Sequence, residues 1–285
     1  MSSTSKKTVL VTGCSAGGIG AALALALAKH GHNVYATARN TAKIPTELSG
    51  LPNVTTLQLD VSSSASVSGA AQAVSEKGKG LDVLVNNAGF GLTMPLLDVD
   101  VAQAQQLYDT NVWGALRTIQ AFSGLLIASK GRVVNISSVG AVVNTPWIGI
   151  YSSSKAALNM LSDTLRLELS PFKVSVVTIM VGTIASHFHA NEPDVVLPPS
   201  SRYSAIRDTI NRWAKGQAGP KGGSVQDLAE SLVVDVVGKP GGFWVWKGPN
   251  SGMVKFLTRW VPASTLDGMM SNGQGLDELT KNLQR

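Results

Sequence analysis

Tyr151 and Lys155 have the types and the spacing that proton chemistry requires. They lie four residues apart in the stretch WIGIYSSSKAALNMLSDTLRLELS, and positions four apart in a helix share one face. A phenol ordinarily loses its proton near pH ~10, and a neighbouring cation lowers that pKa by favouring the phenolate. The pair can therefore act as a general acid or base near neutral pH. Any long helix can also carry such a pair by chance, so the surrounding elements have to decide.

The first of these elements is a glycine-rich turn near the amino terminus. Residues 8–12 (TVLVT) predict a buried strand, residues 13–20 (GCSAGGIG) follow it, and an apolar helix then runs to Gly31. Glycines allow the backbone to approach a pyrophosphate, and a helix start offers free N–H groups. The pattern predicts a dinucleotide-binding turn, with a plain tight turn as the alternative.

The residue after the second predicted strand indicates which dinucleotide is bound. Residues 33–38 form that strand, Arg39 follows it, and the first acidic residue of the chain is Glu47. Enzymes that prefer NAD place a carboxylate near this position to hold the ribose 2′-hydroxyl. A guanidinium instead binds a 2′-phosphate with two hydrogen bonds. We therefore expect Arg39 to select NADP(H) over NAD(H).

The rest of the chain alternates strands with helices. Further strands are predicted at residues 54–59, 81–85, 132–136, 174–181 and 243–246, and helices at 101–130 and 225–237. This alternation predicts one α/β domain over residues 1–285, a Rossmann fold with a doubly wound, parallel, seven-stranded sheet. Ligands bind such sheets at the carboxyl ends of the strands, and Asn86, Ser138 and Gly182 fall there.

Three segments lie outside this alternation. Residues 1–7 are expected to be a flexible tail. Residues 186–216 contain a proline-containing loop and then a short helix with apolar residues at helical spacing, and we expect them to form a substrate lid. Residues 243–285 form an aromatic C-terminal extension, whose stretch FWVWKGPNSGMVKFLTRWV holds three tryptophans and three cations. That extension can cap the pocket, form a subunit contact or touch a membrane interface.

Taken together, these motifs resemble the classical short-chain dehydrogenase/reductase family from about residue 8 to residue 186, with weaker agreement to residue 246. Ser138 precedes Tyr151 by thirteen residues, as the family shows, which favours it over Ser137. The glycine turn, the strand end Ala-Thr-Ala-Arg and the aromatic tail are similar to fungal reductases related to NADPH-dependent 1-acyldihydroxyacetone-phosphate reductase and to secondary-metabolite ketoreductases. The motifs that carry the resemblance are the glycine turn, Asp60, the Asn-Asn-Ala-Gly stretch at 86–89, Asn111, Ser138, the Tyr-x-x-x-Lys pair and the segment after the sixth strand.

The resemblance implies oxidation and reduction at an alcohol or carbonyl carbon. Tyr151 would give a proton to the carbonyl oxygen, and Lys155 would hold the nicotinamide ribose and lower the pKa of the phenol. Ser138 would hydrogen-bond the substrate oxygen. Asn111 would support a water that relays protons through Lys155.

The expected cofactor cleft departs from the family pattern in two places. The family has Gly-x-x-x-Gly-x-Gly, but four residues separate Gly13 from Gly18, so either Gly17 or Gly18 takes the middle role. Val181-Gly182 replaces the family's Pro-Gly, and Ser186 replaces a threonine that contacts the nicotinamide amide together with Ile184. The predicted cofactor-binding residues are Gly13, Ser15, Gly18, Ile19, Gly20, Arg39, Asp60, Val61, Asn87, Ala88, Gly89, Tyr151, Lys155, Gly182, Ile184 and Ser186.

The substrate is expected to be a hydrophobic ketone or the matching alcohol, because the residues near the catalytic positions in chain order are apolar. Each of them can equally be an ordinary core residue. The candidate substrate contacts are Phe90, Met94, Val139, Trp147, Phe188 and Tyr203. By analogy with the family, we also expect a homodimer or homotetramer formed through the helices of Asn111 and Tyr151.

Composition excludes several other classes of function. The net charge is +6 and the pI about 9.5, but no run of five basic residues indicates nucleic-acid binding. The single cysteine, Cys14, and four histidines in two i, i+2 pairs predict no metal site. The amino terminus has no apolar leader, and the longest apolar run, residues 21–28, is too short to span a bilayer. A soluble, cytoplasmic protein is expected.

The predicted function is NADPH-dependent reduction of a ketone to a secondary alcohol, in a reversible reaction with Tyr151 as the general acid. Two alternatives remain open. The same tyrosine can catalyse a non-redox isomerisation or dehydration, or the protein can be a non-catalytic NADP-binding regulator.

Overall fold

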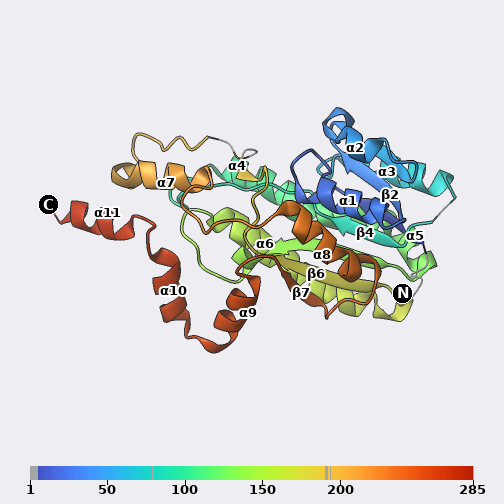
Figure 1. The fold of residues 1–285 in the computed structure, drawn as a ribbon. Coiled ribbons are helices and arrows are strands. Elements are labelled where there is room, and N and C mark those ends of the chain that lie inside the picture. Colours follow the sequence, from blue (N-terminus) through green and yellow to red (C-terminus); the bar gives the residue numbers. More distant parts are fainter. Residues whose placement is uncertain (1–5, 79, 190–191, 193, 285) are drawn as a thin grey trace.

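The computed structural model describes residues 6–78, 80–189, 192 and 194–284. Its centre is a parallel seven-stranded sheet with the order β3-β2-β1-β4-β5-β6-β7, which confirms the predicted fold (Figure 1). The order reverses between β1 and β4, so that a crevice opens there at the carboxyl edge. The strands are β1 Thr8–Val11, β2 Asn33–Ala38, β3 Val54–Gln58, β4 Val83–Asn86, β5 Arg132–Ser138, β6 Ser175–Val181 and β7 Trp244–Lys247.

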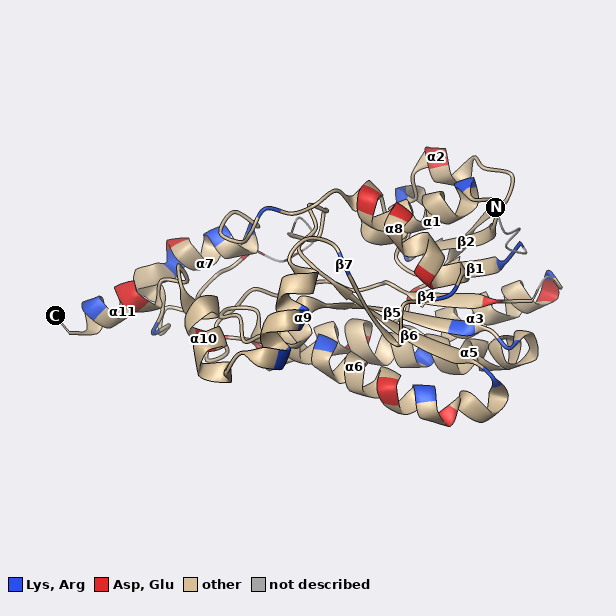
Figure 2. Ribbon diagram, turned by 60° about the horizontal axis from the view of Figure 1, so that its bottom comes forward, with Lys and Arg blue, Asp and Glu red and all other residues tan. Residues whose placement is uncertain are grey.

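Helices cover both faces of this sheet. On one face lie α1 (Ile19–Lys29) and α8 (Val225–Val237), and on the other lie α3 (Ser64–Glu76), α5 (Gly114–Ser129) and α6 (Gly149–Glu168), as Figure 2 shows. Strand side chains point alternately to the two faces. Val9 and Val11 therefore pack with α1 and α8, whereas Leu10 between them packs with Phe122 of α5.

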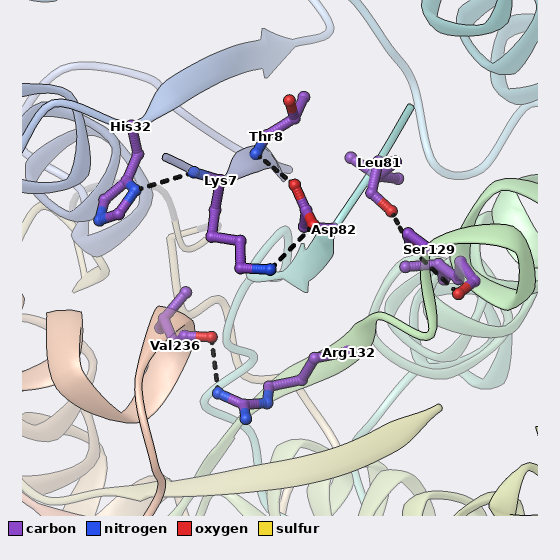
Figure 3. Close-up of polar contacts among 9 residues, drawn as sticks. Lys7, Thr8, His32, Leu81, Asp82, Ser129, Arg132 and Val236 are labelled. Carbon is purple, nitrogen blue, oxygen red and sulfur yellow. Dashed lines mark hydrogen bonds and ion pairs between the residues drawn. The ribbon is translucent and has the colours of Figure 1, made fainter. Parts of the chain in front are cut away.

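The amino edge of the sheet is fixed by ion pairs and hydrogen bonds (Figure 3). The carboxylate of Asp82 accepts hydrogen bonds from the Thr8 backbone N–H at 2.8 Å and from Lys7 Nζ at 3.1 Å. Arg132 donates to the carbonyl of Val236 at 2.8 Å, at the end of α8. Lys7, which the sequence placed in the tail, is thus held by the sheet, while residues 1–5 lie outside the described residues.

The helix predicted over residues 101–130 is interrupted in the middle. It divides into α4 (Val101–Tyr108), a π-helical turn η2 (Asp109–Trp113) and α5. A π turn contains one extra residue per turn and often marks a functional site. Here it carries Asn111, whose side chain it directs into the protein interior.

The C-terminal extension forms helices that the sequence did not define. After β7 come α9 (Ser251–Trp260), α10 (Ala263–Ser271) and α11 (Leu276–Leu283). In Figure 1, α11 lies beside α7 (Arg207–Ala214), away from the sheet. Leu276 and Leu279 of α11 pack against a small core of Trp147, Ile206 and Ile210. The extension therefore contacts the segment that follows β6 and the loop that precedes α6.

Candidate active site

Helix α6 positions Tyr151 and Lys155 at the carboxyl edge of the sheet. Lys155 is 6% exposed, and its Nζ lies 5.9 Å from the centre of the Tyr151 ring. That Nζ donates a hydrogen bond to the carbonyl oxygen of Ile136 on β5, at 2.9 Å. The predicted neighbourhood of phenol and ammonium is present, and it is tied to the strand that ends at Ser138.

The acidity of the phenol differs from the expectation. Burial raises the pKa of Tyr151 to about 12, a hydrogen bond with the Ser138 side chain opposes this rise, and the charge of Glu192 adds to it. Burial likewise lowers the pKa of Lys155 to about 8. The expected lowering of the phenol pKa is therefore wrong for the polypeptide alone, because burial has the largest effect on that pKa and Lys155 Nζ donates to Ile136.

Ser138 and Asn111 complete the predicted catalytic set. Ser138 ends β5, and a Cβ placed on Gly140 would lie 3.4 Å from its Oγ and 3.8 Å from Tyr151 Cε1. Asn111 is 1% exposed and exchanges two hydrogen bonds with the backbone of Phe90, at 3.1 and 3.0 Å. Its Nδ2 also donates to Ser154 Oγ at 3.2 Å. Asn111 thus links η2, α6 and the loop after β4, and its role in a water relay stays a prediction.

The glycines of the turn differ in backbone conformation and in how closely they pack. Gly13 and Gly17 have φ values of 74° and 73°, a conformation that a residue with a side chain rarely adopts. Gly18 is instead the N-cap of α1, and its own φ is −94°. Gly20 lies so close to the Gly13 carbonyl and the Asn87 amide that a Cβ would overlap both. Gly17 thus has the positive φ and Gly18 caps the helix, and which of the two takes the middle role toward the phosphates stays a prediction.

The turn is fastened to the end of β4 by Thr12, which sequence reasoning missed. Its Oγ1 accepts hydrogen bonds from the backbone N–H groups of Asn87 at 2.9 Å and Ala88 at 3.0 Å. Asn87 Nδ2 donates to the carbonyls of Thr12 and Gly13 at 2.9 and 3.2 Å. Gly89 follows, and a Cβ there would lie 2.9 Å from Asn111 Oδ1. These contacts bring the Asn-Asn-Ala-Gly stretch against the glycine turn.

Three of the predicted cofactor-binding residues lie at the ends of β2 and β3. Arg39 is exposed immediately after β2. Asp60 accepts hydrogen bonds from the Ser62 N–H at 3.0 Å and the Ser62 hydroxyl at 2.7 Å, so its carboxylate shapes the turn after β3. Val61 is buried against Gly114 of α5.

The segment after β6 crosses the carboxyl edge toward the glycine turn. A Cβ on Gly182 would overlap the Pro249 carbonyl, so this position has no room for a side chain. Ile184 pairs with Gly223, and Ser186 Oγ accepts from the Phe188 N–H at 3.3 Å. His187, which the sequence did not single out, donates its backbone N–H to the Gly17 carbonyl at 3.2 Å, and its ring lies against Gly17.

The candidate substrate residues divide into two groups. Phe188 stacks edge-on against Tyr151, with ring centres 5.2 Å apart. Trp147 and Tyr203 contact each other at 5.3 Å in the small core beside α7. Met94 joins this second group through its backbone N–H, which donates to the Trp147 carbonyl at 2.7 Å. Phe90 is fixed by Asn111 as described above, and Val139 begins the short helix η3 (Val139–Ala141) after Ser138.

The residues present fit a dinucleotide. The N-terminus of α1 has no side-chain cap and no acidic residue in its first turn, so its free N–H groups and dipole can accept a phosphate. The close approaches at Gly13 and Gly20 leave a side-chain-free surface before it. Arg39 supplies a cation at the end of β2, and Tyr151 and Lys155 lie at the other end of the crevice.

The described residues give little support for a metal site, a reactive thiol or a membrane-spanning helix. The described residues contain no group of three or more histidine, cysteine, aspartate or glutamate side chains placed to hold a metal. Burial raises the pKa of Cys14 to about 12, which keeps the thiol protonated and unreactive. Within the described part of the chain, no helix is long and apolar enough to cross a membrane.

Comparison with known proteins defines the class. The family model for short chain dehydrogenases matches residues 7–195. The chain therefore belongs to the short-chain dehydrogenase/reductase family, as its motifs and fold predicted. It is an oxidoreductase with a Rossmann fold.

Individual relatives are fungal. The short-chain dehydrogenase ptmH of Penicillium ochrochloron is 42% identical over 258 residues, which cover 90% of this chain and 94% of that protein. The short-chain dehydrogenase cctT of Talaromyces islandicus is 38% identical and covers 96% and 97%. The NADPH-dependent 1-acyldihydroxyacetone phosphate reductase of Schizosaccharomyces pombe is 37% identical and covers 72% and 70%.

Solved structures share the fold. A short-chain dehydrogenase from Streptomyces avermitilis has a TM-score of 0.79 at 25% identity and covers 99% of this chain and 100% of its own. A Burkholderia cenocepacia short chain dehydrogenase, determined in complex with NADP, has a TM-score of 0.75 at 23% identity and covers 93% and 97%.

The buried ammonium of Lys155 generates a prediction about stability. Its pKa is about 8 in the folded protein against 10.5 for an unburied lysine. The unfolded chain therefore binds more protons between these values, and the free energy of unfolding should rise with pH from about 8 to about 10. Lys155→Met should remove this contribution and be more stable than the wild type at neutral pH. Urea denaturation at several pH values measures the effect.

The matched control is Lys281→Met, which alters an exposed lysine of α11. It should keep the wild-type dependence on pH. If Lys155→Met showed the same rise as the wild type and this control, the assigned burial of the ammonium would be contradicted.

Proposed function

We propose that the protein is an NADPH-dependent reductase that converts a hydrophobic ketone to a secondary alcohol, in a reversible reaction. The observation that carries this proposal is the convergence of Ser138, Tyr151 and Lys155 at the carboxyl edge, beside a glycine turn suited to a dinucleotide. The names of a fungal relative and of a structural neighbour, NADPH-dependent and NADP-bound respectively, support the choice of cofactor.

In this proposal the bound NADPH supplies the hydride, and the protein supplies the proton. The high pKa of Tyr151 keeps its phenol protonated at neutral pH, which is the state that a general acid needs. Ser138 donates a hydrogen bond to the substrate oxygen and so holds it at the phenol. Lys155 adds positive charge beside the ring, which favours the phenolate left after proton transfer.

The proposed apolar pocket rests on the aromatic residues beside Tyr151. Phe188 packs against the phenol, and Trp147, Tyr203 and Ile206 form a small apolar core nearby in the segments that lead into α6 and α7. Apolar walls exclude water and favour a ketone with apolar substituents. The alternatives are a non-redox isomerisation or dehydration through Tyr151 and a non-catalytic NADP-binding regulator, and both lack ketone-dependent oxidation of NADPH.

Tyr151→Phe tests the chemical step. We expect it to lower kcat about 100-fold to 10,000-fold, because the general acid is lost, while leaving the dissociation constant for NADPH nearly unchanged. Turnover is measured as loss of NADPH absorbance with a panel of bulky and small ketones, and binding by NADPH fluorescence. Tyr108→Phe is the matched control, because Tyr108 ends α4 and has no assigned role.

The result also separates the alternatives. NADPH binding without oxidation by any ketone in the wild type would support the regulator or the non-redox enzyme. Full turnover in Tyr151→Phe would overturn the proposed mechanism.

Arg39→Ala tests the cofactor preference. Loss of charge-assisted hydrogen bonds to the 2′-phosphate should weaken NADPH binding about tenfold to a hundredfold. NADH lacks this phosphate, so its binding should change little. Isothermal titration with both dinucleotides measures the ratio, and Arg202→Ala, an exposed arginine outside the predicted cleft, is the control. Equal losses for the two dinucleotides would count against the role of Arg39.

Two exposed apolar surfaces suggest how the protein assembles. The first lies on the outer faces of α4, η2 and α6 and supports the predicted homodimer or homotetramer; its exposed residues are Val101, Trp113, Met160 and Leu167. The second lies on α9 and holds Met253, Phe256 and Trp260 next to Lys255 and Arg259, with no acidic residue on the helix. Apolar rings beside cations suit an anionic lipid interface, and we propose a weak lipid contact there.

Separate variants distinguish these two surfaces. Met160→Glu should lower the molar mass from light scattering to that of a monomer, because it places a charge in the subunit interface. Phe256→Glu should leave that mass unchanged and reduce sedimentation with anionic vesicles severalfold. The two variants serve as controls for each other. A change of mass in Phe256→Glu, with no vesicle binding by the wild type, would make α9 a subunit contact instead.

A further inference from the structure

A buried carboxylate lies next to the proposed substrate pocket, and the motifs of the sequence do not account for it. The side chain of Glu192 is 2% exposed. Its Oε2 accepts a hydrogen bond from Thr93 Oγ1 at 2.7 Å, and its Oε1 lies 3.1 Å from Nδ1 of His189. Burying a carboxylate costs free energy unless it is paired. The contact with Thr93 is therefore a specific link, not a solvated surface contact.

This link joins two segments that meet over Tyr151. Thr93 belongs to the loop after β4, whose Phe90 is fixed by Asn111. Glu192 belongs to the segment after β6, together with Phe188. A Cβ on Gly91 would lie 2.6 Å from both Glu192 Oε1 and Phe188 Cζ, so the two side chains pack together on Gly91.

Because Gly91 has no side chain, the Phe188 ring can approach the backbone there. The Phe188 ring and the Glu192 carboxylate both lie on the backbone at Gly91, and the centre of that ring is 5.2 Å from that of the phenol at an interplanar angle of 65°. If Glu192 moved away from Thr93, Phe188 would lose a neighbour with which it shares the space at Gly91. The position of the Phe188 ring against the phenol is thus linked to the Thr93–Glu192 contact through Gly91.

We propose that the hydrogen bond from Thr93 to Glu192 positions Phe188 against Tyr151, and that Glu192 is thereby a specificity-determining residue for the ketone. This inference rests on the reductase function proposed above and adds a positioning residue to it. Thr93 and Glu192 are separated by 99 positions in the chain, so the contact couples the loop after β4 to the segment after β6.

The charge of Glu192 gives a second, separable effect. The charged or titratable groups shown near Tyr151 include Lys155 on α6 and Glu192 on the segment after β6, and His189 of that segment contacts both Glu192 and Phe188. The negative charge of Glu192 raises the pKa of Tyr151, after burial and against the hydrogen bond of Ser138. A contact with only a structural role would not require this charge.

Three variants separate the hydrogen bond from the charge. Thr93→Val removes the donor and keeps the shape, Thr93→Ser keeps the donor and is the matched control, and Glu192→Gln keeps an acceptor but removes the charge. KM and kcat are measured for ketones of graded bulk, together with the pH profile of kcat/KM. Hydrogen exchange of residues 186–189 is measured on each variant without substrate.

For Thr93→Val we expect KM values that change by about tenfold and a weaker preference among bulky ketones. Hydrogen exchange of residues 186–189 should become faster, and the NADPH dissociation constant should stay within about twofold. Thr93→Ser should match the wild type in all of these. For Glu192→Gln the high-pH limb of kcat/KM should move to lower pH, because a phenol without a nearby anion loses its proton more readily.

Other outcomes decide against the inference. If Thr93→Val matched Thr93→Ser in ketone preference and in hydrogen exchange, the positioning role would be wrong. An unmoved pH profile in Glu192→Gln would overturn the electrostatic effect. If Thr93→Val fails to fold by circular dichroism, Thr93→Ala, which also lacks the donor, decides the positioning role by the same measurements. If the wild type reduced no ketone, the proposed function would fail while the hydrogen exchange still tested the contact.

Discussion

Burial of an ammonium and a phenol on one face of α6 is the constraint on which the site depends. Lys155 is satisfied there by the carbonyl of Ile136, which ties α6 to β5 two residues before Ser138. The strand that supplies Ser138 and the helix that supplies Tyr151 are therefore fixed by the same contact. Removing charged groups from water is costly, and the protein offsets that cost with a hydrogen bond that also sets the catalytic geometry.

Asn111 has the equivalent role for the loop after β4. Because η2 is a π turn, Asn111 is directed inward, and its amide pairs with both the N–H and the C=O of Phe90. Its bond to Ser154 reaches α6. The cofactor crevice and the substrate side are thus held to one helix, and a loop without regular structure gains a defined conformation.

The fold and most of the candidate site follow from local sequence patterns. The strand at Asn33–Ala38 was predicted with its observed bounds, because a short and mostly apolar run is typical of a strand that is buried on both faces. The sequence could not decide between Gly17 and Gly18 as the middle glycine of the turn. The turn is one residue longer than the family pattern, so either glycine can take that position, and the choice depends on backbone torsion. The pKa of Tyr151 was predicted in the wrong direction, because spacing reports a neighbour but not desolvation. Glu192 was missed, because its partner is distant in the chain and its segment has no periodicity.

Trp147 connects the C-terminal extension to the loop that leads into the candidate active site. Its φ is 72°, an unfavourable conformation for a bulky residue that surrounding structure must maintain. The Met94 N–H donates to its carbonyl, its own Nε1 donates to the carbonyl of Gln274 at 3.2 Å, and the Tyr203 ring packs against it. Three segments distant in the sequence therefore hold the loop that leads into α6. Since Trp147 lies two residues before the helix begins at Gly149 and four before Tyr151, the extension helps to fix the position of the phenol.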